Sequence, residues 1–222
     1  MSALVIGAPS LTLCETDALK PSRLSCRTPK LRGASLGIKL MDKSQNSGEA
    51  CVPLERLVLP PVLDVCCGPR SMWFDKKDKR GLFVDRREEE HEKPRKCRKN
   101  VTKISIRPDV LADFTQLPFP DESFRLVVMD PPHYTEGMAG KGHIFKHYGC
   151  LFPGWQEMLA EGFKECFRVL KPEGTFIFKW CEVEIPLSSI LELTPEKPLF
   201  GHRTGRRENT HWVTFIKQND RH

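Results

Sequence analysis

Four aspartates end four short apolar runs of this chain, where a parallel sheet would place groups that bind ligands. They are Asp64 in LDVCCGP, Asp85 in GLFVD, Asp113 in DVLAD and Asp130 in RLVVMD. Ligands of open parallel sheets bind at the carboxyl ends of the strands. Asp85 follows Asp64 by 21 residues, a spacing at which an acidic residue commonly accepts hydrogen bonds from ribose hydroxyls. A helix N-cap would explain Asp85 equally well.

The elements that must position these residues begin at residue 61, where apolar runs alternate with turn residues and amphipathic segments. This texture predicts the alternating strands and helices of a parallel sheet. A helix is predicted from about Trp155 to Leu170, with its apolar residues on one side. The charged residues of the segment 76–107 predict a solvated helix face. The predicted strands cover 61–67, 81–85, 109–113, 125–130, 174–180 and 211–217.

Composition limits the possible environments of the chain. Its 222 residues predict a weakly ordered extension over 1–50, with Met41 as a candidate native start, and a single domain over 51–222. No apolar run approaches the ~20 residues that span a bilayer. Nine cysteines without paired CxxC spacing, and no signal peptide, predict reduced thiols, no metal site and a cytoplasmic protein. The formal charge of +6 suits a polyanionic partner.

Taken in order, the segments LDVCCG, FVD, LADFTQLPFPDESFRLVVMDPP and FRVLKPEGTFIFKW resemble the motifs of class I S-adenosylmethionine-dependent methyltransferases. The resemblance covers roughly residues 61–217. It implies a Rossmann-like α/β fold, with a mostly parallel seven-stranded sheet, flanking helices and an antiparallel last strand. It also implies that the cofactor is S-adenosyl-L-methionine.

The same resemblance assigns roles to single residues. Asp64, Cys66 and Gly68 would face the methionine portion of the cofactor, Asp85 would hold the ribose, and Asp113 with Phe114 would hold the adenine. Two positions depart from the family's pattern. The turn CCGPRS has one glycine where the family usually has more, and Arg125 stands where an acidic residue is common.

DPPH at residues 130–133 resembles the DPPY-type motif of amino-methyltransferases, which act on exocyclic amines of bases and include enzymes of phages and prophages. Asp130 and the Pro131 carbonyl would accept N–H bonds from the amine and make its nitrogen a better nucleophile. Pro132 would stiffen the turn. The ring of His133 or of Tyr134 would stack on the base, which contributes ~1 to 3 kcal/mol. A strand end followed by a rigid proline turn is the alternative interpretation.

These residues lead to one main hypothesis and two alternatives. The main hypothesis is an N-methyltransferase for an exocyclic amine, with adenine N6 in DNA as the target. Sequence specificity would be low or supplied by a partner, because no separate recognition domain is predicted. The alternatives are a methyltransferase for small molecules or proteins, and a silent member of the fold that only binds. Oligomeric state is not predicted.

Two further segments carry residues suited to nucleic acid. The glycine-rich segment 133–154 is predicted to be a binding loop rather than a regular helix. It holds Lys141, His143, Lys146, His147 and Tyr148. The histidines, with Cys150, have a spacing that would suit a metal on a helix, but exposed histidines are the preferred interpretation. A predicted hairpin near the C-terminus would expose Arg203, Arg206 and Arg207, either to phosphates or to solvent.

Overall fold

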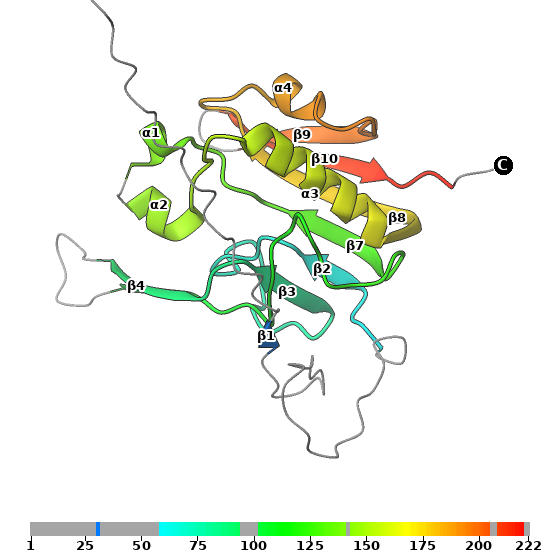
Figure 1. Ribbon diagram of the computed structural model, residues 1–222, viewed down its shortest axis with the longest axis horizontal. Helices are drawn as coiled ribbons and strands as arrows, with labels where there is room; N and C mark the ends of the chain where they lie inside the picture. Colours follow the sequence, from blue (N-terminus) through cyan, green and yellow to red (C-terminus); the bar gives the residue numbers. More distant parts are fainter. Residues whose placement is uncertain (1–29, 32–57, 94–101, 141–142, 205–207, 220–222) are drawn as a thin grey trace, which may run out of the picture.

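The computed structural model describes residues 30–31, 58–93, 102–140, 143–204 and 208–219. A mixed sheet runs through these residues in the order β1-β6-β3-β2-β7-β8-β10-β9 (Figure 1). The parallel strands are β2 (Val62–Asp64), β3 (Gly81–Asp85), β6 (Val110–Leu111), β7 (Phe124–Met129) and β8 (Leu170–Cys181). Strand β10 (Thr210–Ile216) pairs antiparallel with β8 and with β9 (Phe200–Thr204), and the short β1 (Lys30–Leu31) pairs antiparallel with β6. Apart from β1, this is the predicted Rossmann-like methyltransferase sheet, and the predicted fold class is confirmed.

Helix α3 (Trp155–Val169) covers one face of the sheet and confirms the predicted helix (Figure 1). Its buried side includes Leu159, Phe163 and Cys166, and the Phe163 ring lies 5.0 Å from that of Phe178 in β8. Gly162 permits a close approach at this interface. A Cβ at this position would lie 2.6 Å from the ring of Phe114, so the glycine allows Phe114 to pack under the helix.

The charged segment corrects one prediction. Instead of a solvated helix, it contains the antiparallel hairpin of β4 (Glu89–Lys93) and β5 (Thr102–Ile106), which extends away from the main sheet (Figure 1). Ile104 and Ile106 are buried, so alternate residues of β5 anchor the hairpin to the body of the protein. The connecting residues 94–101 lie outside the described part of the chain.

The glycine-rich segment also differs from its prediction, because it contains short helices. They are α1 (Glu136–Ala139) and α2 (His143–Tyr148), and α2 ends where Gly149 takes a φ of +79° and donates its N–H to the Phe145 carbonyl. A further short helix, α4 (Leu187–Leu191), follows β8. None of the helices in the described ranges is long and apolar enough to span a bilayer. Apart from residues 30–31, the extension over 1–50 and Met41 lie outside the described residues.

Candidate active site

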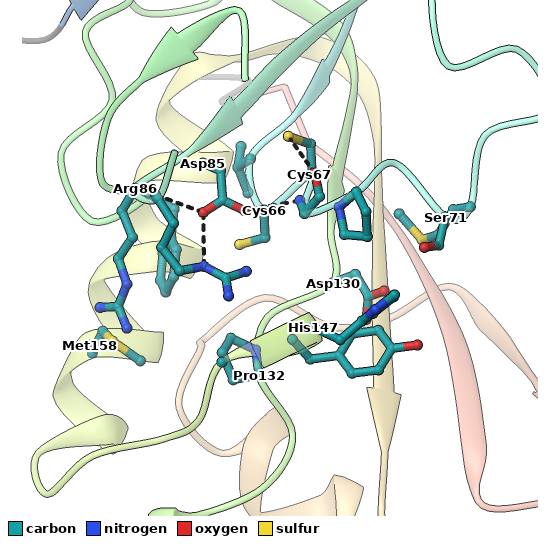
Figure 2. A pocket seen from close by; sticks show the side chains of 17 residues that line it. Cys66, Cys67, Ser71, Asp85, Arg86, Asp130, Pro132, His147 and Met158 are labelled. Carbon is teal, nitrogen blue, oxygen red and sulfur yellow. Dashed lines mark hydrogen bonds and ion pairs between the residues drawn. The ribbon is translucent and has the colours of Figure 1, made fainter. Parts of the chain in front are cut away.

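A cleft lies at the carboxyl ends of β2, β3 and β7, between the turn after β2 and helix α2 (Figure 2). Six of the eleven residues to which the resemblance assigned a role line it: Cys66, Gly68, Asp85, Phe114, Asp130 and Pro132. The other five do not line it: Asp64, Asp113, Pro131, His133 and Tyr134. The topology therefore brings together about half of the predicted site and distributes the rest around it.

Asp85 joins the ends of β2 and β3. The Gly68 N–H donates to its Oδ2 at 2.9 Å, and Gly68 has a φ of +48°, a conformation that favours glycine. Asp85 Oδ1 accepts the Arg87 N–H at 2.9 Å and lies 3.3 Å from Arg87 Nε. Dashed lines in Figure 2 mark the interactions of Asp85. These donors stabilise a carboxylate that is only 5% exposed. The longer Arg87 Nε contact is the weakest of the three, so a ligand hydroxyl could replace it.

Asp64 lies beneath the cleft and not in its wall. It is fully buried and accepts hydrogen bonds from the Trp73 indole at 2.8 Å and the Cys66 N–H at 3.3 Å. Burial raises its pKa to about 7, although both hydrogen bonds favour the charged form. Asp64 thus ties the turn after β2 to the strand, which differs from the contact with a cofactor that the sequence predicted.

This raised pKa predicts a pH-dependent stability. Between about pH 4 and about pH 7 the folded protein keeps a proton on Asp64 that the unfolded chain releases, so rising pH lowers the free energy of unfolding. The full effect is on the order of 4 kcal/mol. Urea unfolding across this range is expected to show a smaller decline for Asp64→Asn than for the wild type. Asp75→Asn, at an exposed position, is the control and should keep the wild-type decline. Equal declines in all three proteins would contradict the assignment.

Asp113 and Phe114 have different surroundings. Asp113 Oδ1 accepts hydrogen bonds from the N–H and the hydroxyl of Thr115, at 3.0 and 2.9 Å, and so fixes the turn after β6. Phe114 is buried against Gly162 and contributes part of its ring to the cleft. Asp113 does not itself line the cleft, and its bonds to Thr115 hold the turn that carries Phe114.

Asp130, at the end of β7, lies in the cleft wall between two basic groups. Lys179 Nζ donates to its Oδ2 at 2.6 Å, and His133 Nε2 lies 2.9 Å from its Oδ1. Burial alone would raise the pKa of Asp130, but His133 and Lys179 outweigh it and hold this pKa below its usual value. The cleft therefore contains a carboxylate that stays ionised at neutral pH.

The end of β8 holds the rest of the DPPHY segment away from the cleft. His133 packs edge-on against Trp180, with 5.1 Å between the ring centroids. The Tyr134 hydroxyl lies 3.6 Å from Cys181 Sγ, and burial raises the pKa of Tyr134 to about 12. Neither ring lines the cleft, so the two side chains that were predicted to stack on the base lie outside it.

Two rings of α2 line the cleft instead. His147 and Tyr148 line the cleft, and their ring centroids are 4.3 Å apart (Figure 2). Both belong to the segment that the sequence predicted to meet phosphates and bases. Sequence reasoning missed Arg87, which lines the cleft. It also missed Arg86 and Met158, which line the cleft as well (Figure 2). The pair RR directly after the strand-ending Asp85 was the available signal for the two arginines.

The thiols of the cleft are unsuited to covalent catalysis. Burial raises the pKa values of Cys66 and Cys67 well above the usual range, with Asp64 and Asp85 adding to the effect. Both side chains therefore remain neutral thiols near neutral pH. Within the described ranges, no group of three or more His, Cys, Asp or Glu side chains is arranged to hold a metal ion.

Comparison with known proteins shows similarity at the level of folds. No protein-family model matches the sequence, and no curated protein matches it. The PH0226 protein of Pyrococcus horikoshii OT3 is 15% identical with a TM-score of 0.43, over 71% of this chain and 81% of that one. The 1,6-didemethyltoxoflavin-N1-methyltransferase of Burkholderia thailandensis, solved with 1,6-didemethyltoxoflavin and S-adenosylhomocysteine, is 15% identical with a TM-score of 0.41, over 71% of each chain. A SAM-dependent methyltransferase from Aquifex aeolicus is 12% identical with a TM-score of 0.38, over 70% of this chain and 81% of that one. The strand order and the strand directions of this chain define its fold.

Proposed function

We propose that this chain is an S-adenosylmethionine-dependent methyltransferase that acts on an exocyclic amine of a nucleobase, with adenine N6 in DNA as the first candidate. The observation that carries the proposal is the position of two carboxylates in one cleft. Asp85 ends β3 and Asp130 follows β7, the two strands that lie on either side of β2, and both carboxylates line the cleft. One suits a ribose and the other suits an amine.

The cofactor half of the cleft matches the chemistry of an adenosyl group. Asp85 offers carboxylate oxygens to the ribose hydroxyls, and Phe114 with Met158 offers an apolar wall to the adenine. The open space beside Gly68, where a Cβ would meet only the His147 carbonyl at 4.0 Å, allows close approach of a ligand to the backbone. S-adenosylmethionine, when bound, supplies a methyl group on a positively charged sulfur.

Asp130 is proposed to accept an N–H bond from the target amine. The lone pair of an exocyclic amine is drawn into the ring, so an acceptor for its N–H makes the nitrogen more nucleophilic. Lys179 and His133 contact one oxygen each, and a carboxylate has about four acceptor positions. Asp130 can therefore hold its neighbours and a substrate N–H together, while its low pKa keeps it from protonating.

The rings of α2 are proposed to stack on the base. His147 faces the cleft on the side of Asp130 and Pro132 (Figure 2), and Tyr148 lines the same cleft. Stacking on an aromatic ring contributes ~1 to 3 kcal/mol per base. A base inside a duplex would have to leave the stack to reach this position. A partner protein is proposed to supply sequence specificity, because the described residues form one sheet with its covering helices and a single hairpin.

Transfer of a labelled methyl group tests this function. The protein is incubated with methyl-labelled S-adenosylmethionine and with unmodified DNA, RNA or a metabolite extract, and the labelled products are identified by mass analysis of nucleosides. N6-methyladenine is the expected product. Label in a metabolite alone would show that the substrate is a small molecule and not a nucleobase. Cofactor binding without transfer of any label would favour a binding module.

A further inference from the structure

A second groove lies directly beside the cofactor cleft, between the turn after β2 and strand β5 of the hairpin. The two hollows share one wall, to which Gly68, Pro69, Ser71 and His147 contribute. A molecule lying in the groove is therefore next to the opening of the cleft. Neither the motifs nor the proposed cofactor contacts account for this groove.

The groove is lined by positive charge. Its basic side chains are Arg70, Lys76, Lys77, Lys103 and Arg107. Within the part of the chain that the structure describes, no carboxylate lines it. The cations come from both walls, so their charges act on the same space and not on opposite faces of the protein.

The local structure explains this arrangement on the side of the hairpin. Strand β5 alternates, with Ile104 and Ile106 buried and Lys103 exposed, and Arg107 directly after the strand is exposed as well. Lys103 and Arg107 both line the groove. Glu92 lies opposite Lys103 in the hairpin register, yet it does not line the groove. The alternation thus leaves Lys103 and Arg107 exposed at the groove, to which the buried Ile104 also contributes.

Two of the five cations serve the structure. Arg70 donates to Asp109 at 2.9 Å and to the carbonyl of Lys76 at 2.7 Å, and Arg107 pairs with Glu90. The other three, Lys76, Lys77 and Lys103, are exposed, and their ammonium groups form no ion pair with any other described residue. Two unpaired lysines on one wall and a third on the other can contact successive phosphates of a strand that lies between them.

We propose that this groove binds the phosphodiester backbone of a nucleic-acid strand whose target base enters the adjoining cleft. The inference rests on the proposed function, which assigns the cleft to the cofactor and the target base. It adds the surface that would hold the rest of the substrate strand. Lysines that contact phosphates position a strand without reading its sequence, in line with a partner that supplies specificity. DNA and RNA share this backbone, so both are tested.

The test compares two triple variants with equal charge. One combines Lys76→Gln, Lys77→Gln and Lys103→Gln. The control combines Lys164→Gln, Lys171→Gln and Lys197→Gln, at exposed positions that line neither hollow. Binding of labelled single-stranded DNA and RNA is measured by fluorescence anisotropy over a range of salt concentrations. Binding of S-adenosylhomocysteine is measured on the same proteins by calorimetry.

The groove variant is expected to bind both nucleic acids at least about tenfold more weakly, and its slope of log affinity against log salt should be about 2 smaller in magnitude, at ~0.7 per lost phosphate contact. The control variant should bind like the wild type, and S-adenosylhomocysteine affinity should stay unchanged in both. Equal binding by all three proteins, no binding by the wild type, or equally effective displacement by polyglutamate would overturn the groove assignment. Groove-dependent binding without any affinity for S-adenosylhomocysteine would support the groove and instead reject the proposed methyltransferase activity.

Discussion

Replacing Asp85 with alanine is expected to lower the affinity for S-adenosylmethionine at least about a hundredfold. The carboxylate would hold both ribose hydroxyls, and hydrogen bonds to a charged group contribute about 1.5 to 3 kcal/mol each. Asp85→Asn, which keeps one acceptor oxygen, should show a smaller loss. Calorimetric titration of each variant with S-adenosylmethionine and S-adenosylhomocysteine measures the effect.

The matched control changes Arg87, the side chain that contacts Asp85. Arg87→Ala removes the 3.3 Å contact of Arg87 Nε with Oδ1 but leaves the carboxylate and the Gly68 N–H bond in place. Its affinity for the cofactor is expected to stay within about threefold of the wild type. If Arg87→Ala lost as much affinity as Asp85→Ala, the contact between the two side chains, and not the carboxylate itself, would determine binding. Wild-type affinity in Asp85→Ala would reject the ribose assignment.

Elements with a strong local signal could be predicted from the sequence. Strand β3 has the predicted bounds, 81–85, because all five of its residues are buried and a turn precedes it. Helix α3 follows its 3.6-residue apolar period to within one residue of the prediction. The hairpin β4–β5 was not predicted because EEHEK, the sequence of β4, has no strand propensity of its own. Its strand forms by pairing with β5, which is a tertiary effect and leaves no local pattern.

In the candidate site too, some residues could be predicted from local sequence and others depend on tertiary contacts. Asp85 and Asp130 could be predicted because strand ends converge at one edge of a parallel sheet. The position of a side chain relative to that edge depends on its neighbours, as Asp64 shows by turning to Trp73 below the cleft. His133, the ring predicted to stack on the base, lies outside the cleft for a similar reason, because it packs against Trp180 of β8. The pairing of β7 with β8, which aligns Met129 with Phe178, was needed to find Lys179 beside Asp130.

Asp130 offers the second large effect. Asp130→Asn keeps the shape of the side chain but loses the charge and one of its acceptor oxygens, so the rate of methyl transfer is expected to fall at least about a hundredfold, as for loss of one preorganised electrostatic group. Affinity for S-adenosylmethionine should change by less than about threefold. Single-turnover transfer at saturating cofactor isolates this step from binding. Normal transfer by Asp130→Asn would reject the proposed contact with the amine.

Lys179→Met tests whether the neighbouring ammonium group controls the ionisation of Asp130. Without the ammonium 2.6 Å from Oδ2, burial is opposed only by His133, and the pKa of Asp130 should rise. Because the ionised form is the active one in this mechanism, transfer in Lys179→Met should fall at a higher pH than in the wild type as the solution is acidified. Activity near neutral pH should persist, since Oδ2 becomes free to accept the amine. A rate–pH profile with the acid limb unmoved would show that Lys179 does not control the ionisation of Asp130. Loss of transfer at every pH would show instead that the ammonium itself takes part in the reaction.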